Sequence, residues 1–268
     1  MPAERPSIFD LCPTCLNPKP SVLHDQRFME ELLHPEEQPP DIEKTKEWEY
    51  GNNIWSICPM PDGSALVGGY GGKIKRLDKN GTTLKYVGEY GNDIVSICPM
   101  PDGSALVGGW GGKIMRLDKN GTTLKDVGEY GNNIESICSM PDGSALVGGL
   151  GGKIMRLDNN GTTLKDAGEY GNNILSICSM PDGSALVGGW EGKIMRLDKN
   201  GTTLKDVGEY GNDIESISLA VDFSTMKKSI LVGGVGGKLH LWEVPENKLR
   251  AYNERMSKIP EVPPMPEY

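Results

Sequence analysis

A segment of 40 residues occurs five times along this chain of 268 residues, and it restricts the folds that the sequence can adopt. The first four copies differ from one another at few positions and contain no insertion, whereas the fifth diverges after its first ten residues. A strict period of this length indicates that each copy folds as one unit and packs against its neighbours. The copies begin at Glu49, Glu89, Glu129, Glu169 and Glu209.

Each copy is predicted to contain four short strands. The turn Pro61-Asp62-Gly63 separates the first two, because proline fixes φ and glycine accepts a positive φ. Asn80-Gly81 is a strong hairpin signal between the last two. Helical periodicity is absent, and β-branched residues occupy the strand positions. The predicted strands of the first copy are residues 54–60, 64–68, 73–78 and 82–90.

Repeated sheets of four antiparallel strands are typical of β-propeller blades. Apolar residues occur on both faces of each predicted sheet, so one sheet cannot bury them alone. Radial stacking buries both faces, and closing the ring removes the exposed ends. The expected fold is therefore all-β: a five-bladed β-propeller of four-stranded antiparallel blades over residues 45–245, preceded by an irregular N-terminal arm.

The outer strand of the fifth blade has two candidate sources. The fifth copy itself supplies predicted strands at residues 214–220, 229–233 and 238–244. Residues 45–51 align with residues 85–91, so they could complete this blade from the N-terminal side and close the ring; residues 246–254 are the alternative. A third arrangement is a ring completed by another chain.

The repeat also resembles a known family. The run Ile54-x-Ser56-Ile57-x-x-x-Pro61-Asp62-Gly63-x-Ala65-Leu66-Val67-Gly68-Gly69-x-x-Gly72-Lys73-Ile74-x-x-Leu77-Asp78 is similar to that of WD-repeat propellers, and Lys238-Leu239-His240-Leu241-Trp242-Glu243-Val244 resembles their strand-ending signature. The sequence departs from that family in three ways: the first four copies have Leu-Asp for Trp-Asp, the Gly-His pair is missing, and there are five blades rather than seven. The resemblance implies a propeller that presents a partner-binding face, of a kind frequent in bacterial signalling and conflict systems.

Three positions of the repeat change chemical type from copy to copy against a nearly constant background. They are expected at one end of the ring, and the resemblance implies that they contact a partner. Exposed aromatic residues among them would supply binding energy; the alternative is unconstrained surface. The first column is Trp55, Val95, Glu135, Leu175 and Glu215. The second column is Tyr70, Trp110, Leu150, Trp190 and Val235. The third column is Asn53, Asp93, Asn133, Asn173 and Asp213.

No catalytic constellation is predicted, and no cofactor is expected. The recurring aspartates belong to turns and hairpins, whereas catalysis needs one asymmetric site. The first four copies contain no histidine, no nucleophile elbow and no phosphate-binding loop. Glu135 and Glu215 are the remaining candidate acid pair. The aspartates of the turns are Asp62, Asp102, Asp142 and Asp182, and those of the hairpins are Asp78, Asp118, Asp158 and Asp198.

Composition limits the partners and the compartment. The net charge of −9 and the isoelectric point near 5.0 argue against nucleic acid as a general partner. No apolar run approaches the roughly 20 residues of a membrane span, and no secretory signal is expected. Four cysteines share one repeat position and are expected as buried thiols in a reducing, cytoplasmic setting. They are Cys58, Cys98, Cys138 and Cys178.

The segments outside the repeats differ in composition. Residues 1–44 contain eight prolines and nine acidic against four basic residues, which predicts an extended arm with a short helix at residues 21–34. Residues 246–268 form a C-terminal extension with a Pro-rich tail. The spacing of Cys12 and Cys15 suits a metal, but with His24 and His34 it matches no standard zinc finger, so ordinary arm residues are favoured.

The function expected from these features is a non-enzymatic recognition or scaffold module that binds another protein through one face of the ring. The alternative is a lectin-like propeller in which Trp110 and Trp190 stack on sugar rings and Asn and Asp side chains bind hydroxyl groups. Neither nucleic acid nor a membrane is expected as a partner.

Overall fold

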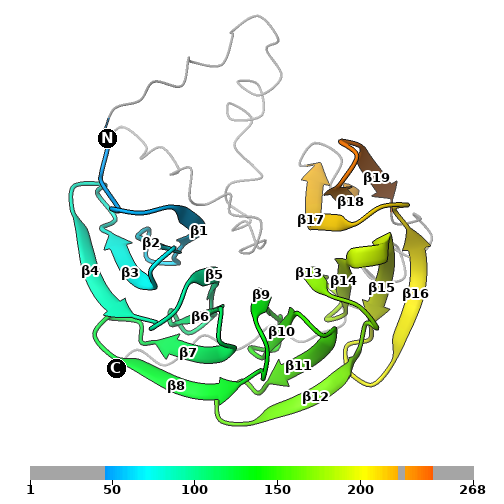
Figure 1. The fold of residues 1–268 in the computed structure, drawn as a ribbon, viewed down its shortest axis with the longest axis horizontal. Helices are drawn as coiled ribbons and strands as arrows, with labels where there is room; N and C mark the ends of the chain where they lie inside the picture. Colours follow the sequence, from blue (N-terminus) through cyan, green and yellow to red (C-terminus); the bar gives the residue numbers. More distant parts are fainter. Residues whose placement is uncertain (1–45, 223–226, 244–268) are drawn as a thin grey trace, which may run out of the picture. The chain divides into compact units, whose positions relative to one another are not determined.

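The computed structural model describes residues 46–222 and 227–243 (Figure 1). The expected arm at residues 1–44, its helix at residues 21–34 and the extension at residues 246–268 lie outside this part of the chain. The described part consists of strands joined by turns, with one short 3₁₀-helix, η2 (Trp190–Gly192). The all-β class predicted from the sequence is confirmed.

Five antiparallel sheets follow one another in sequence order. The first contains β1 (Ile54–Pro59), β2 (Ala65–Gly69), β3 (Lys73–Leu77) and β4 (Leu84–Glu89). The second contains β5 (Ile94–Pro99), β6 (Ala105–Gly109), β7 (Lys113–Leu117) and β8 (Leu124–Glu129). The third contains β9 (Ile134–Ser139), β10 (Ala145–Gly149), β11 (Lys153–Leu157) and β12 (Leu164–Glu169). The fourth contains β13 (Ile174–Ser179), β14 (Ala185–Gly189), β15 (Lys193–Leu197) and β16 (Leu204–Glu209). The fifth contains β17 (Ile214–Asp222), β18 (Lys227–Gly234) and β19 (Leu239–Glu243).

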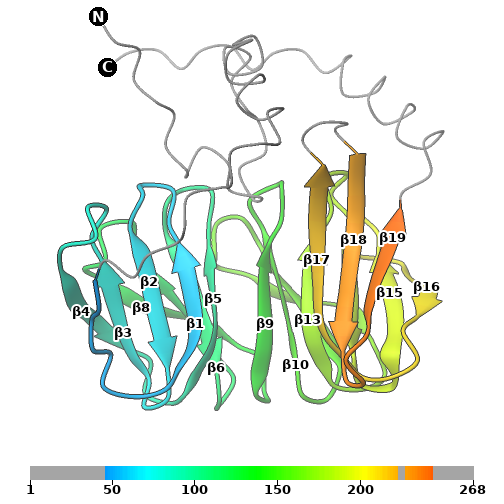
Figure 2. The same cartoon turned by 90° about the horizontal axis from the view of Figure 1, so that it is seen from above.

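The sheets pack in series through their first strands. β1, β5, β9, β13 and β17 lie next to one another along the inner side of an arc, and the fourth strands lie on its outer side (Figure 1). Figure 2 shows the strands of successive sheets running across the arc in similar directions, so that the turns gather at two edges. Each edge therefore presents the same turn of every repeat side by side.

A repeated apolar core fills each junction between sheets. At the first junction, Leu66 and Ile74 of the first sheet pack against Ile94, Ile97 and Val107 of the second, and all five side chains are buried. The matching residues of the later repeats form equivalent clusters at the other three junctions. The apolar residues predicted on both faces of each sheet are thus buried by the neighbouring sheets.

A glycine sets how closely two sheets approach. A Cβ atom at Gly68 would lie 2.8 Å from Ile94 Cγ2 and 2.9 Å from Ile97 Cδ1, closer than real Cβ contacts. Gly188 faces Ile214 and Ile217 in the same way at the last junction. Each pair of isoleucines thus sits on a strand position that has no side chain. The four glycines are Gly68, Gly108, Gly148 and Gly188.

Two polar contacts recur at every junction. The amide of Ile97 donates to Ser56 Oγ of the preceding sheet at 3.0 Å, and the later repeats form the same bond between Ile137 and Ser96, Ile177 and Ser136, and Ile217 and Ser176. The amide of Gly71 also donates to Asp93 Oδ1 of the next sheet at 2.8 Å. These bonds fix the register between neighbouring sheets.

Ring closure, which the sequence predicted, is not seen in the described residues. The fifth sheet has three strands, residues 46–50 form no strand, and the alternative outer strand at residues 246–254 lies outside the described part. The same contact is repeated at every junction, so each sheet is rotated by a similar amount relative to the preceding one. Over five sheets these rotations do not bring the last sheet to the first (Figure 1).

Within residues 46–222 and 227–243, the array therefore ends in two uncovered apolar faces. We call the face of the first sheet that carries Ile54 and Ile57 the leading face; these side chains are 45% and 65% exposed, whereas Ile94 and Ile97 are buried. We call the face of the fifth sheet that carries Leu239 and Leu241 the trailing face; these are 69% and 60% exposed.

The glycine at each junction predicts a measurable stability difference. Gly148→Ala should lower the free energy of unfolding by about 1–3 kcal/mol, because the new methyl group collides with Ile174 and Ile177. Gly88→Ala, on β4, is the matched control: its Cβ would meet Leu124 Cδ2 at 3.5 Å, an ordinary contact distance. Urea unfolding of both variants and the parent measures the difference. Equal losses for the two variants would contradict this account of the junction.

Candidate functional site

The first variable column occupies a β-bulge in every repeat. In the first sheet, Ile54 pairs with Gly69 and Ser56 with Gly68, which leaves Trp55 as the extra residue. The same shift occurs in the other four sheets at Val95, Glu135, Leu175 and Glu215. A bulged residue has no cross-strand partner and its side chain is re-aimed. This column can therefore vary without disturbing the sheet.

The second column lies beside the bulge at the same edge of the sheets. The amide of Tyr70 donates to the carbonyl of Asn53 at 3.0 Å, and Trp110, Leu150, Trp190 and Val235 make the same bond in the later repeats. The bond ties the end of the second strand to the start of the first. The structure thus brings the first and second columns together, as expected from the sequence.

Three aromatic side chains gather where the first two sheets meet. The ring of Trp55 lies 6.2 Å from that of Tyr70 in an edge-on arrangement and 6.0 Å from that of Trp110. All three are between 42% and 51% exposed. We call Trp55, Tyr70 and Trp110 the aromatic cluster. Such rings interact favourably with one another and leave apolar surface open to a partner.

Other members of these two columns differ in exposure. Trp190 is 46% exposed and Val235 is 52% exposed, whereas Leu150 is half-buried. Trp190 precedes Glu191, whose φ of 67° falls in the left-handed region that glycine occupies at the equivalent Gly71. The side chain of Glu191 accepts a hydrogen bond from Asn172. The edge near the fourth sheet therefore differs locally from the other repeats.

The third column has a structural role at four of its five positions. Asp93, Asn133, Asn173 and Asp213 each accept a hydrogen bond through Oδ1 from a backbone amide of the preceding sheet. Asn and Asp both provide this oxygen, which explains why the column alternates between them. Asn53, the first member, is exposed. The sequence alone did not separate this linking role from partner contact.

Two acidic members of the first column influence each other. Burial raises the pKa of Glu135 above its usual value, and the charge of Glu215 raises it further. The two residues occupy the bulges of the third and fifth sheets. Protonation of Glu135 is thereby favoured relative to an exposed glutamate.

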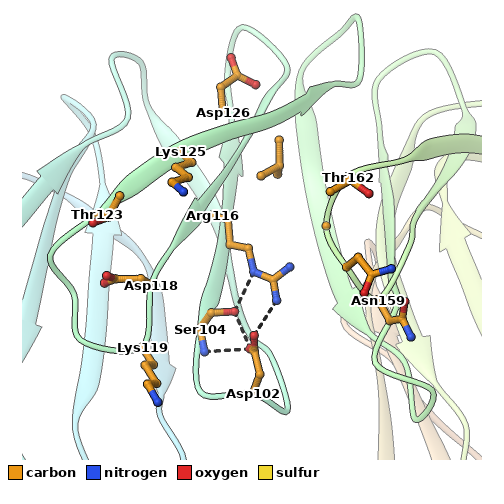
Figure 3. Close-up of a pocket in the computed structure, with 13 residues that line it drawn as sticks. Asp102, Ser104, Arg116, Asp118, Lys119, Thr123, Lys125, Asp126, Asn159 and Thr162 are labelled. Atoms are coloured by element: carbon orange, nitrogen blue, oxygen red, sulfur yellow. Dashed lines mark hydrogen bonds and ion pairs between the residues drawn. The ribbon is translucent and has the colours of Figure 1, made fainter.

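A polar groove of about 880 Å³ lies between the second and third sheets (Figure 3). Sequence reasoning did not single it out, because its lining residues recur in the first four repeats. Arg116 projects from β7 toward Ser104 and Asp102, while the hairpin containing Asn159 and Thr162 forms the opposite wall. Positive and negative side chains alternate along it, so the groove presents no dominant charge.

Two charged side chains of this groove, Arg116 and Asp102, are engaged in holding the sheet. Arg116 donates to Asp102 Oδ2 at 2.8 Å and to Ser104 Oγ at 2.9 Å, and Ser104 donates to Asp102 Oδ1 (Figure 3). Partial burial raises the pKa of Asp102, but the hydrogen bonds from Ser104 and the charge of Arg116 outweigh it and lower the pKa below its usual value. The other three complete repeats contain the same triad, with the same direction of shift.

The hairpin aspartates are likewise structural. Asp78 accepts hydrogen bonds from the amide and the hydroxyl of Thr82, at 2.8 and 2.6 Å, and these lower its pKa to about 2. Asp118 is held in the same way by Thr122, and its pKa is also about 2. These carboxylates close the turn between the third and fourth strands, as the sequence indicated.

Cys98, Cys138 and Cys178 are free thiols, and Cys98 is buried, as is Cys58. Burial raises the pKa of Cys178 to about 12 and raises those of Cys98 and Cys138 as well, so the reactive thiolate is disfavoured. Cys12, Cys15, His24 and His34, considered for zinc, lie outside the described residues. Within residues 46–222 and 227–243, no cluster of His, Cys, Asp and Glu could hold a metal ion.

The fold is similar to that of a solved structure, the computationally designed Ika8 protein, with a TM-score of 0.58 and 15% sequence identity. The similarity covers 71% of this chain and 58% of the designed chain, so the chain spans less than two thirds of that protein's length. At this identity the likeness concerns the fold alone. No protein-family model and no curated protein matches the chain. In the part of the chain that is described, no helix is long and apolar enough to cross a bilayer.

The triad of Asp, Ser and Arg predicts how stability responds to acid. The pKa of each triad aspartate is lower in the folded chain than in the unfolded one, so the unfolded chain binds protons more readily. The stabilisation is present above pH ~4 and is lost as the pH falls through the folded pKa values. Urea unfolding at several pH values between 2 and 7 measures this loss. Replacing Asp62, Asp102, Asp142 and Asp182 by Asn should flatten the profile; an unchanged slope would contradict the assignment.

The pair Glu135 and Glu215 predicts a coupled titration. In Glu215→Gln the pKa of Glu135 should fall, because one negative charge is removed, yet remain above the usual value because Glu135 is still half-buried. A titration of the Glu135 side-chain carbon by NMR measures both effects. Glu209→Gln, at an exposed residue of β16, is the control and should leave Glu135 unchanged. A Glu135 pKa that is the same in Glu215→Gln as in the wild type would contradict the electrostatic coupling of the two residues.

Proposed function

We propose that the chain is a non-enzymatic recognition module, and that it binds another protein through the sheet edge that carries the first and second variable columns. The observation that carries this proposal is the aromatic cluster: Trp55, Tyr70 and Trp110 lie side by side and remain largely exposed. Large aromatic side chains at a protein surface are the usual centres of binding energy in an interface.

The contrast between the recurring residues within the sheets and the varying residues at the sheet edge supports this function. The side chains that vary are the bulged residues and their neighbours, which have no cross-strand partner to satisfy. The side chains that recur, such as the triad of Asp102, Ser104 and Arg116, are bonded within the sheet. An edge of this kind can change its specificity without a loss of fold stability.

The chemistry of the described residues supports binding rather than catalysis. The aspartates with lowered pKa values accept hydrogen bonds that hold turns, and the thiols with raised pKa values are disfavoured as nucleophiles. A recurring group bonded within its own repeat does not supply the asymmetric set that a reaction needs. The protonated thiols of Cys98, Cys138 and Cys178 also suit a reducing compartment, and we propose a cytoplasmic location.

We propose further that the five sheets are blades of a WD-repeat-like propeller. The radial order of the first strands and the burial of both faces of the inner sheets support this architecture. The leading and trailing faces stay uncovered in the described residues, so completion of such a ring requires one more junction of the same kind.

The proposed edge predicts a partner that depends on its aromatic residues. The variant Trp55→Ala/Trp110→Ala/Trp190→Ala should lose at least about tenfold in affinity for a protein captured by the wild type, because each ring provides apolar contact. Tyr86→Ala is the matched control, since Tyr86 is an equally exposed aromatic on β4, away from the edge. Pull-down followed by titration calorimetry with the captured protein measures the change.

The same variants separate the carbohydrate alternative. Tryptophan rings flanked by polar groups also stack on sugars, so a glycan-array signal that disappears in the triple variant, without loss of a protein partner, would replace the proposed function by a lectin-like one. Binding of either kind that survives in the triple variant would remove this edge as the site.

A further inference from the structure

The two ends of the sheet array carry the two halves of the contact that joins sheets inside the chain. Each inner junction places two isoleucines of one sheet over a glycine of the preceding sheet. The leading face retains the isoleucines, Ile54 and Ile57, with no preceding sheet in the described residues to receive them. The trailing face retains the glycine, Gly233, at the position that Gly68 occupies in the first repeat.

The apolar parts of the two faces are complementary. A Cβ atom at Gly188 would lie 2.8 Å from Ile217, whereas at Gly233 the nearest side-chain atom is Leu239 Cδ1 of the same sheet, 3.9 Å away. Leu239 stands at the repeat position of Ile74, which is fully buried against the next sheet, yet Leu239 is 69% exposed. The trailing face thus has a glycine site like those at the four inner junctions, but without, in the described part of the chain, the two isoleucines that cover each of those glycines.

The polar contacts are complementary as well. In the described residues, the amide-to-hydroxyl bonds begin with that from Ile97 to Ser56 and end with that from Ile217 to Ser176. The equivalent groups at the two ends of the array are the Ile57 amide and the Ser216 hydroxyl, which belong to no bond of this series among those residues. The series of amide bonds to Asn or Asp runs from Gly71 and Asp93 to Glu191 and Asp213. Its end members are Asn53, on the leading side, and the Gly236 amide, on the trailing side.

A third feature repeats the pattern. A Cβ atom at Gly112 or Gly152 would collide with the backbone of an asparagine that leads into the next sheet, Asn132 or Asn172. At the matching Gly237, no atom of the described residues other than its chain neighbours lies within 4 Å of the added Cβ. In the first repeat the corresponding asparagine is Asn52, which is exposed. At the inner junctions, these glycines let the asparagine backbone of the next sheet approach closely. Gly237 leaves the same space open at the trailing end.

We propose that two copies of this chain associate head to tail, the leading face of one copy packing on the trailing face of the other as a further sheet-to-sheet junction. The occupant is a second copy because each face lacks what the opposite end of the same chain provides, in apolar shape and in both series of hydrogen bonds. The contact continues an interface that the chain already forms four times. It is heterologous, so copies close into a ring when their rotation allows it.

This association is independent of the proposed binding edge. Its residues lie on the faces of the first and fifth sheets, whereas the rings altered in the triple variant, those of Trp55, Trp110 and Trp190, lie at the sheet edge, with Trp55 as the bulged residue of β1. The association can therefore fail while the proposed function stands, and the reverse also holds.

The first test is the mass of the full chain in solution, measured by light scattering during size-exclusion chromatography. The wild type should have at least twice the 29.1 kDa of one chain. Ile57→Asp, which charges the leading face, and Leu239→Asp, which charges the trailing face, should each reduce it to one chain. Both positions are exposed, so the fold should persist, and circular dichroism checks this. Val207→Asp, at an exposed apolar residue of β16, is the control and should retain the wild-type mass.

Mixing the two variants distinguishes head-to-tail contact from other arrangements. Ile57→Asp retains an intact trailing face and Leu239→Asp retains an intact leading face, so an equimolar mixture should form a species of two chains, although each variant alone is a single chain. A single-chain wild type would overturn the proposal, since the faces would then be covered within one chain. A mixture that stays at one chain, or an Ile57→Asp variant as large as the wild type, would overturn it too.

Discussion

The architecture depends on a close approach between sheets, in which two isoleucines of one sheet rest on a glycine of another. At Gly68 any side chain would collide with Ile94 and Ile97, so the missing Cβ sets the distance and the angle of the junction. Glycine in a strand costs conformational entropy and offers nothing to pack, so its recurrence needs a compensating contact. The buried isoleucines provide it, and the hydrogen bond from Ile97 to Ser56 fixes the register.

A bulge beside this junction separates stability from variation. Because Ile54 and Ser56 pair with adjacent glycines, Trp55 is released from the ladder, and the same holds for its counterparts. Ile94, one residue from the bulged Val95, is fully buried. Adjacent positions in one strand thus obey different constraints: one is fixed by packing, whereas the other can be Trp, Val, Leu or Glu. This local division explains how near-identical repeats present a chemically uneven edge.

The sequence predicted the parts of the fold that depend on local signals. Proline, aspartate and glycine at 61–63 and the Asn80-Gly81 pair located the turns, and the observed strands agree with the predicted ones to within two residues in the first copy. The side chains of the first and second columns were correctly expected to share an edge. Closure was not predictable in the same way, because it depends on the sum of small rotations between sheets. The linking role of Asp93 was also hidden, since its hydrogen-bond partner, Gly71, belongs to a different sheet.

The fifth copy shows which features the junction requires. It diverges along β17 and β18, which are longer than their counterparts, and it replaces Arg76 and Leu77 by Leu241 and Trp242. Trp242 still packs against the fourth sheet, so the contact behind it is preserved. On its other side the copy retains Gly233, although no described side chain of another sheet comes near it. A strand glycine without a neighbour is a net cost to stability. An incoming pair of isoleucines would turn that cost into the same close contact that holds the rest of the array together.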